Sequence, residues 1–315
     1  MSKFINPFTD WGFKRLFGQE ESKGILIGFL NTLLEGEKVI KDVTFQNNEQ
    51  TAPVKGERTI VYDVYCQTAS GEEFIVEMQN QAQDTFKERA LYYVSNAIAR
   101  QGKEGGEWGY RVRAVYGVFF VNFSMRGSEK LRTDVVLADR DTGQLFSDKL
   151  RQVFISLPYF DKTEAECETD FERWIYVLTN MDKLDKIPFK TDLDVMKELE
   201  RIASLRSLTP QEMWDYDCAL NSYRSNEGAW RAMERKVVEA EANAKRRIRE
   251  ARAKAKEAEA KAEAKAKEAK AEAEAKAKEA KAEKEDMVRE LKRLNMPIAT
   301  IAQVTKLSEE EIEAL

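Results

Sequence analysis

The sequence predicts an α/β domain followed by a long charged helix and a small helical tail. Runs of β-branched and aromatic residues alternate with amphipathic helical segments in the first half of the chain, a pattern typical of an α/β core. Nearly all the aromatic residues lie before about residue 230, and Ala, Lys and Glu dominate beyond it. The first part can therefore bury a hydrophobic core, whereas the second cannot.

The composition narrows the chemistry that the chain can perform. Its 315 residues include no histidine, which excludes Ser-His-Asp and Cys-His mechanisms and imidazole-bound zinc. The net charge of −5 argues against a sequence-independent coat on nucleic acid, but it is compatible with carboxylates that hold a metal ion. Three scattered cysteines, no signal peptide and no long apolar run predict a cytoplasmic protein that does not enter a membrane.

Periodicity and turn residues place the elements of the first part. A helix is expected over residues 10–34, capped by Thr9 or Asp10 and interrupted near Gly18 and Ser22, and a second over 86–101. Residues 164–230 are expected to be helical and to pack on the core. Strands are expected at 41–47, 59–68, 72–79, 113–123 and 153–156, of which 113–123 is the most apolar and therefore central in the sheet.

The hairpin formed by 59–68 and 72–79 carries the chemistry. If its loop is residues 69–71 with Gly71 in the left-handed conformation, Asp63 lies opposite Glu77, with Cβ atoms about 5 Å apart. Gln79 points to the same face as Glu77. Two carboxylates so close repel each other unless one is protonated, both reach water, or a cation lies between them. Apolar neighbours on both sides of the strands favour the cation over the alternative of a solvated face.

With these residues, the sequence resembles the recombination-promoting nuclease / putative transposase family of the PD-(D/E)XK superfamily. The resemblance extends over about residues 4–160 and includes the Asp…Glu-x-Gln hairpin. Its other matching segments are TDWGFKRLFG at 9–18, ILIGFLNTLL at 25–34, IVEMQNQAQDTFKERALYYVSNAIARQ at 75–101 and VFFVNF at 118–123.

The resemblance implies a restriction-endonuclease-like mixed sheet flanked by helices, which cleaves DNA with Mg²⁺ or Mn²⁺. Asp63 and Glu77 would bind the metal ion, and Asp63, Glu77 and Gln79 would be the catalytic residues. Gln79 occupies the place of the superfamily's lysine and carries no charge, which departs from the superfamily pattern but not from that of the family. Whether such a site turns over rapidly is left open.

Five further side chains are candidates for contact with DNA. Lys14 is one helical turn from Asp10, and the two either face the cleft or form an exposed pair that supports the helix. Arg89 and Tyr93 are one turn apart on the helix after the second hairpin strand, where Tyr93 alternatively packs in the core. Arg111 and Arg113 are expected where the central strand begins, near DNA.

The second part is of low complexity. The decapeptide EAKAKEAKAE occurs at residues 263–272 and again at 274–283, and a repeat of 11 residues keeps each position on one face of a helix. The helix is either a lone helix or an Ala-seam coiled coil. Pro297 and Ser308 open two short helices that resemble a helix-turn-helix or form a packing module. The predicted domains are 1–160 (nuclease-like), 161–231 (helical extension), 232–286 (long helix) and 287–315 (tail).

Two functions follow from these observations. The first is a metal-dependent DNA endonuclease linked to recombination or mobile elements. The alternative is a catalytically weak or inactive nuclease-fold protein that binds DNA or a partner, and that forms homo-oligomers through the long helix or the tail. The acidic net charge and the uncharged Gln79 motivate this second hypothesis.

Overall fold

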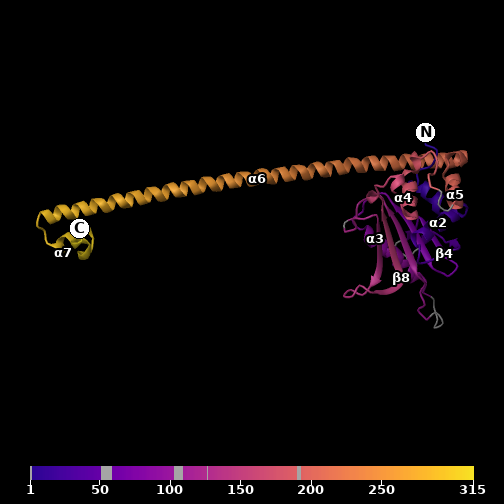
Figure 1. Cartoon of the computed structure of the whole chain (residues 1–315), viewed down its shortest axis with the longest axis horizontal. Helices are drawn as coiled ribbons and strands as arrows, with labels where there is room; N and C mark the ends of the chain where they lie inside the picture. The colour runs from indigo at the N-terminus through magenta and orange to yellow at the C-terminus, as the bar shows by residue number, and fades with distance from the viewer. Residues whose placement is uncertain (1, 51–58, 103–108, 126, 190–192) are drawn as a thin grey trace. The chain divides into compact units, whose positions relative to one another are not determined.

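The computed structural model describes residues 2–50, 59–102, 109–125, 127–189 and 193–315 (Figure 1). The chain divides into two compact units, Met1–Arg231 and Ala232–Leu315. Among the described helices, none combines the length and the apolar composition needed to cross a membrane. The finer division into four domains stays a prediction.

A mixed sheet forms the centre of the first unit. Its strands are β1 (Val43–Phe45), β4 (Val64–Thr68), β5 (Glu73–Gln79), β6 (Val115–Val121), β7 (Arg132–Ala138) and β8 (Leu145–Ser156). Over the described residues the strand order is β1-β4-β5-β6-β8-β7, in which β5, β6 and β8 run parallel and the other pairs are antiparallel. Two short strands, β2 (Glu49–Gln50) and β3 (Ile60–Val61), pair with each other separately. The predicted α/β class with a mixed sheet is confirmed.

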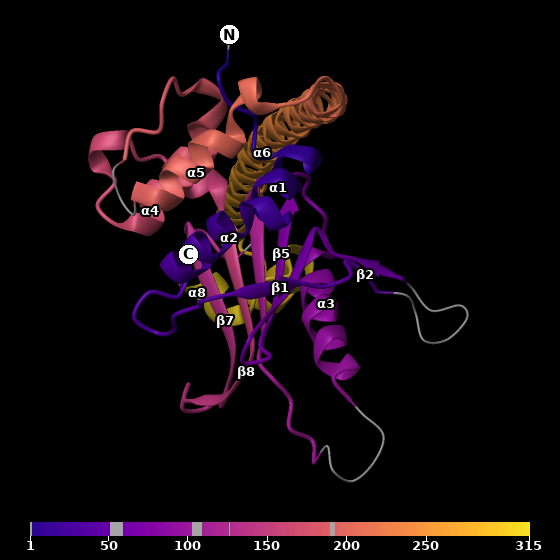
Figure 2. The ribbon, with the colours of Figure 1, turned by 90° about the vertical axis from the view of Figure 1, so that its right-hand side faces the viewer.

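Helices cover both faces of this sheet (Figure 2). Four of them pack on one face: α1 (Asp10–Phe17), α2 (Lys23–Leu33), α4 (Asp170–Asn180) and α5 (Leu193–Ala203). The other face is covered by α3 (Phe86–Arg100). Because side chains alternate along a strand, Phe74 and Val76 of β5 join the first cluster and Ile75 joins the second. Glu73, Glu77 and Gln79 therefore share the face of the sheet that α3 covers.

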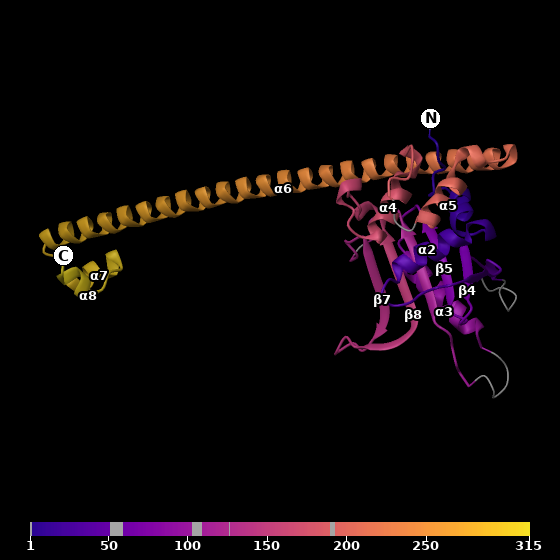
Figure 3. The same cartoon turned by 45° about the vertical axis from the view of Figure 1, so that its right-hand side comes forward.

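Most predicted elements occur, with informative differences at their ends. The helix expected over 10–34 is divided, because α1 ends at Phe17 and the Gly18 N–H donates to the Lys14 carbonyl 2.8 Å away. Thr9 caps α1 by accepting a hydrogen bond from the Gly12 N–H. Strand β7 and the first half of β8 were not predicted. Figure 3 shows where these two strands lie. Their side chains are largely exposed, so they lack the apolar run that marked the end of β8.

The long helix α6 (Pro210–Arg293) begins earlier and ends later than the expected 232–286. Its start is set by Thr209, which exchanges hydrogen bonds with Glu212: the Glu212 N–H donates to Thr209 Oγ1, and the Thr209 N–H donates to Glu212 Oε2. Side chains over 233–284 are exposed, which leaves open the choice between a lone helix and a coiled coil. The tail forms α7 (Ile298–Thr305) and α8 (Glu309–Glu313) as predicted, and it buries Ile301 and Ile312 against Val288.

Close packing of α3 on β6 depends on Gly117. A Cβ at this position would lie 2.8 Å from Cγ1 of Val94 and 2.6 Å from Cε2 of Phe119. We expect Gly117→Ala to lower the free energy of unfolding by about 1–3 kcal/mol, as overpacked cores do. Chemical denaturation followed by tryptophan fluorescence measures this unit, since all five tryptophans precede residue 231.

The matched control is Gly228→Ala in α6, where a Cβ meets nothing within 4 Å. Alanine favours a helix over glycine by about 0.5–1 kcal/mol, so this variant should be as stable as the wild type or more stable. Equal stability of Gly117→Ala and the wild type would contradict the packing described for α3.

Candidate active site

The turn of the β4–β5 hairpin sets the register that the sequence predicts. The Thr68 N–H donates to the Glu72 carbonyl at 2.8 Å, the Gly71 N–H donates to the Thr68 carbonyl at 2.9 Å, and Gly71 has a φ of +83°. Only glycine takes this conformation without strain. The pairing that follows joins Val64 to Val76, so the next position along the ladder brings Asp63 opposite Glu77.

At Asp63 and Glu77, hydrogen bonds from backbone N–H groups to the two carboxylates replace the backbone–backbone bonds of the ladder. The Asp63 N–H donates to Glu77 Oε1 at 3.0 Å, and the Met78 N–H donates to Asp63 Oδ2 at 2.9 Å. The expectation of one continuous strand over 59–68 is therefore wrong. The chain bends at Asp63, and the preceding residues of β3 leave the main sheet to pair with β2. The Glu77 carboxylate thus holds the backbone at Asp63, and the Asp63 carboxylate holds the backbone at Met78.

Burial makes this pair electrostatically costly. Only 3% of Glu77 is exposed. Burial and the neighbouring charge of Asp63 raise the pKa of Glu77 to about 8. Burial also raises the pKa of Asp63, against the opposing effects of the Met78 N–H and the charge of Lys14. Glu77 is buried and Asp63 is half-buried, so ionising both opposed carboxylates is costly unless a cation lies beside them.

Gln79 is held by a cation from α3. Its Oε1 accepts a hydrogen bond from Arg89 Nη2 at 3.0 Å, and its Nε2 donates to the Gln81 carbonyl at 2.9 Å. The same Arg89 Nη2 lies 3.8 Å from Glu77 Oε2, and Nη1 donates to Gln83 Oε1. The Arg89 guanidinium therefore places a positive charge beside Gln79, whose own side chain is uncharged.

Tyr93 supports this guanidinium from one turn further along α3. The Arg89 Cζ lies 5.3 Å from the centre of the Tyr93 ring, a cation–π distance. The ring also meets Tyr62 edge-on, and the Tyr62 hydroxyl donates to the Tyr93 carbonyl. Tyr93 thus packs against the core and contacts Arg89 at the same time.

Lys14 lies at the margin of the site. Its Nζ forms an ion pair with Asp10 at 2.7 Å, and 43% of its side chain is exposed. Its charge lowers the pKa of both Asp63 and Glu77, while Asp10 raises that of Asp63. The ion pair predicted within α1 is present, and the charge of Lys14 also acts on the carboxylates; contact of Lys14 with a DNA phosphate stays a prediction.

Two asparagines that the sequence did not single out position the end of β5. Asn80 Nδ2 donates to the Phe8 carbonyl at 2.8 Å, which ties β5 to the segment before α1. The Asn122 N–H, directly after β6, donates to the Gln79 carbonyl at 2.9 Å. The sequence could have indicated them, because Asn80 and Asn122 directly follow two parallel strands, and functional groups of α/β proteins usually lie at the carboxyl ends of such strands.

The donor set suits a hard divalent cation. Asp63 and Glu77 offer carboxylate oxygens, and each uses one oxygen to accept a backbone N–H. Among the described residues, no third acidic or cysteine side chain completes a larger cluster. A cation at this pair would therefore retain several water ligands, as Mg²⁺ commonly does.

One comparison with known proteins identifies a family. A family model described as PD-(D/E)XK nuclease family transposase matches residues 7–232. Among curated proteins and among solved structures, none matches the chain. The family match confirms the resemblance to PD-(D/E)XK nucleases that the hairpin and its flanking segments indicated.

The raised pKa of Glu77 predicts how stability changes with pH. An ordinary glutamate titrates near 4.5, so between about 4.5 and about 8 the folded state holds a proton that the unfolded state has lost. Ionisation of Glu77 therefore destabilises the fold as the pH rises through this window. In EDTA at pH 8 we expect Glu77→Gln to unfold at a temperature higher by about 2 °C or more, and Mg²⁺ to stabilise the wild type alone.

The control is Glu72→Gln at the other end of the same hairpin. Glu72 pairs with Lys38, and its pKa is lowered despite partial burial, so this substitution should lower the unfolding temperature. A Glu77→Gln protein that unfolds at or below the wild-type temperature at pH 8 would contradict the electrostatic description of the pair.

Proposed function

The chain belongs to the PD-(D/E)XK nuclease family of transposases, and we propose that it is a metal-dependent DNA endonuclease. The single observation that carries the proposal is the pair of opposed carboxylates: buried Glu77 accepts a hydrogen bond from the Asp63 N–H, and half-buried Asp63 accepts one from the Met78 N–H. A pair so costly without a cation is well explained as a binding site for one. Membership of the family supports DNA as the substrate and recombination or mobile elements as the context.

In this proposal Asp63 and Glu77 hold Mg²⁺ or Mn²⁺ through their carboxylate oxygens. When bound there, the cation supplies Lewis acidity toward the scissile phosphate and an activated water. Gln79 would help to orient the attacking water, because its amide can donate and accept hydrogen bonds but cannot take up a proton at neutral pH. The backbone hydrogen bonds of Asp63 and Met78 keep both carboxylates in place while charge develops on the phosphate.

Arg89 takes the electrostatic role that the superfamily assigns to lysine. Its Nη2 lies 3.0 Å from Gln79 Oε1 and 3.8 Å from Glu77 Oε2, so its charge is already beside the reacting groups. A guanidinium is always protonated and matches the geometry of phosphate oxygens. Lys14 is a second source of positive charge, placed to contact a more distant phosphate of the DNA backbone.

The first test of this function is nicking of supercoiled plasmid with and without Mg²⁺. We expect the wild type to nick DNA only with the metal ion, and Asp63→Ala to lose at least 10²-fold in rate, roughly the loss caused by removing one stabilising group from an active site. Asp141→Ala, which removes an exposed carboxylate from the β7–β8 turn, is the matched control and should nick normally. Unchanged nicking by Asp63→Ala would refute the site.

The alternative, a nuclease fold that only binds DNA or a partner, rests on the uncharged Gln79 and the acidic net charge. It predicts no metal-dependent cleavage by folded wild-type protein. In that case the protein would act by forming homo-oligomers through the exposed Ala, Lys and Glu residues of α6 or through the tail.

Arg89 provides a second test. We expect Arg89→Ala to slow nicking about 10²-fold while the protein still binds Mn²⁺ in calorimetry, because the arginine stabilises the phosphate rather than the metal ion. Arg89→Lys should recover part of the rate, since it restores the charge but not the fork of donors. Lys87→Ala, which removes another cation from α3, is the control. Equal rates for Arg89→Ala and Lys87→Ala would contradict the role of Arg89.

A further inference from the structure

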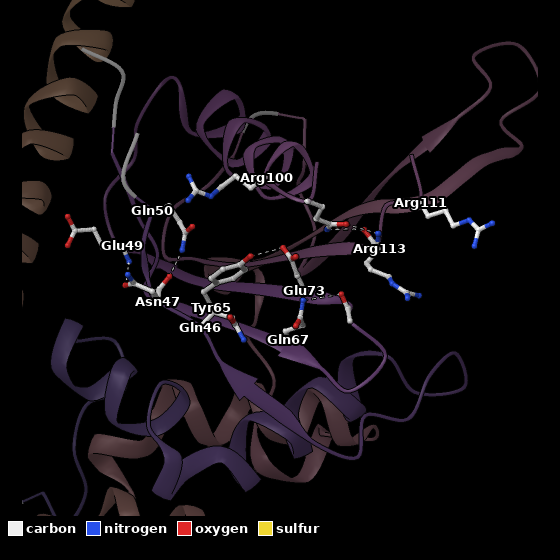
Figure 4. A pocket seen from close by; sticks show the side chains of 12 residues that line it. Gln46, Asn47, Glu49, Gln50, Tyr65, Gln67, Glu73, Arg100, Arg111 and Arg113 are labelled. Atoms are coloured by element: carbon white, nitrogen blue, oxygen red, sulfur yellow. Dashed lines mark hydrogen bonds between the residues drawn. The ribbon is translucent and has the colours of Figure 1, made fainter. Parts of the chain in front are cut away.

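A polar pocket lies against the same hairpin (Figure 4), and neither Asp63 nor Glu77 lines it. Its volume is about 690 Å³. The lining includes three arginines, Arg100, Arg111 and Arg113, together with Tyr65, Glu73 and several amide side chains. This is large enough for a nucleotide and too polar for an apolar ligand.

The pocket shares a face of the sheet with the proposed active site. Glu73 and Glu77 lie on one strand, four residues apart, and both point to the face that α3 covers. At about 3.3 Å per residue they are separated by roughly 13 Å. One short oligonucleotide strand is long enough to span this distance, so a single substrate would reach both places.

Arg111 and Arg113 supply the positive charge. Both side chains are exposed, and neither forms an ion pair with any residue that the structure describes. They project from the segment just before β6, while Gln101 anchors that segment by accepting a hydrogen bond from the Arg113 N–H at 2.6 Å. One acidic side chain, Glu49, also borders the pocket. Guanidinium groups without a protein partner are typical ligands of phosphate.

Glu73 forms a buried acceptor at the back of this pocket. Only 6% of the residue is exposed, and its Oε2 accepts a hydrogen bond from the Tyr65 hydroxyl at 2.7 Å. Figure 4 shows the two side chains pointing toward each other between the arginines and the amides. A carboxylate has about four acceptor positions, so Glu73 retains capacity for a donor on a ligand.

We propose that this pocket binds an unpaired nucleotide, whose phosphate contacts Arg111 and Arg113 and whose base donates an exocyclic amino group to Glu73. The inference rests on the proposed nuclease function, since it assumes that the ligand belongs to the DNA substrate. Cytosine, adenine and guanine carry such an amino group, whereas thymine does not. The pocket therefore favours a single-stranded segment over a duplex and disfavours thymine.

The test is fluorescence anisotropy of labelled oligonucleotides with full-length protein in EDTA, where binding is measured without cleavage. The probes are 12-mers of dC and dT and a blunt 12-base-pair duplex. We expect Arg111→Gln/Arg113→Gln to bind the dC strand about tenfold more weakly, with a salt slope lower by about 0.7 because one phosphate is no longer neutralised. Arg111→Lys/Arg113→Lys should restore most of the affinity.

The control is Arg140→Gln/Arg224→Gln, which removes two exposed arginines outside the pocket. The wild type should prefer dC over dT several-fold, and Glu73→Gln should remove this preference, because an amide serves either base. Displacement of the dC strand by dCMP indicates that the pocket takes a free or terminal nucleotide, and lack of displacement indicates an internal one; both support the proposal.

If Arg111→Gln/Arg113→Gln binds the dC strand with the affinity and salt slope of the wild type, the proposal that the pocket binds a nucleotide is overturned. If the double variant loses as much affinity for the duplex as for the dC strand, the preference for unpaired nucleotides is overturned. Equal binding of dC and dT by the wild type would overturn the role of Glu73. None of these results depends on metal-dependent nicking, so failure of the pocket is distinguishable from failure of the nuclease.

Discussion

Two hydrogen bonds between Asp63 and the strand opposite determine how the candidate site is built. The Asp63 N–H is satisfied by the side chain of Glu77, and the Met78 N–H is satisfied by the side chain of Asp63. These two bonds replace the backbone–backbone hydrogen bonds that would otherwise continue the pairing of β4 with β5. The chain therefore bends at Asp63, and β3 pairs with β2 outside the main sheet. The same bonds hold two carboxylates together at the end of β5, on the face beneath α3. Burial raises the pKa of both groups, and the charge of Asp63 raises that of Glu77 further; a divalent cation would offset this cost.

Local signals predicted much of the fold. Gly71 required a particular turn, and that turn alone was enough to place Asp63 opposite Glu77. The apolar run of β6 predicted a central strand, and Thr9 and Ser308 predicted helix starts. The break at Asp63 was missed because it depends on a side chain from another strand, to which the composition of 59–68 gives no clue. The strand β7 was missed because its exposed residues show no apolar pattern.

The environment of Gln79 could not be predicted either. Arg89 is ten residues further along the chain, and it reaches Gln79 only because α3 packs closely on the sheet. That packing depends on long-range contacts such as the one between Gly117 and Val94, which no local pattern reveals. The positive charge that position 79 lacks is thus brought to it by tertiary structure. Further along the same face, Glu73 and the two arginines before β6 present a different chemistry, suited to an unpaired nucleotide rather than to a metal ion.

The most direct test of the central claim is a crystal of the protein soaked in Mn²⁺ and measured for anomalous scattering. The proposed site predicts a peak between the carboxylates, about 2.2 Å from an oxygen of Asp63 and an oxygen of Glu77, with water completing the coordination. The peak should vanish in Glu77→Gln. Fully occupied Mn²⁺ elsewhere, with Asp63 and Glu77 sharing a proton in a metal-free pair, would contradict the assignment of these two residues as the metal site.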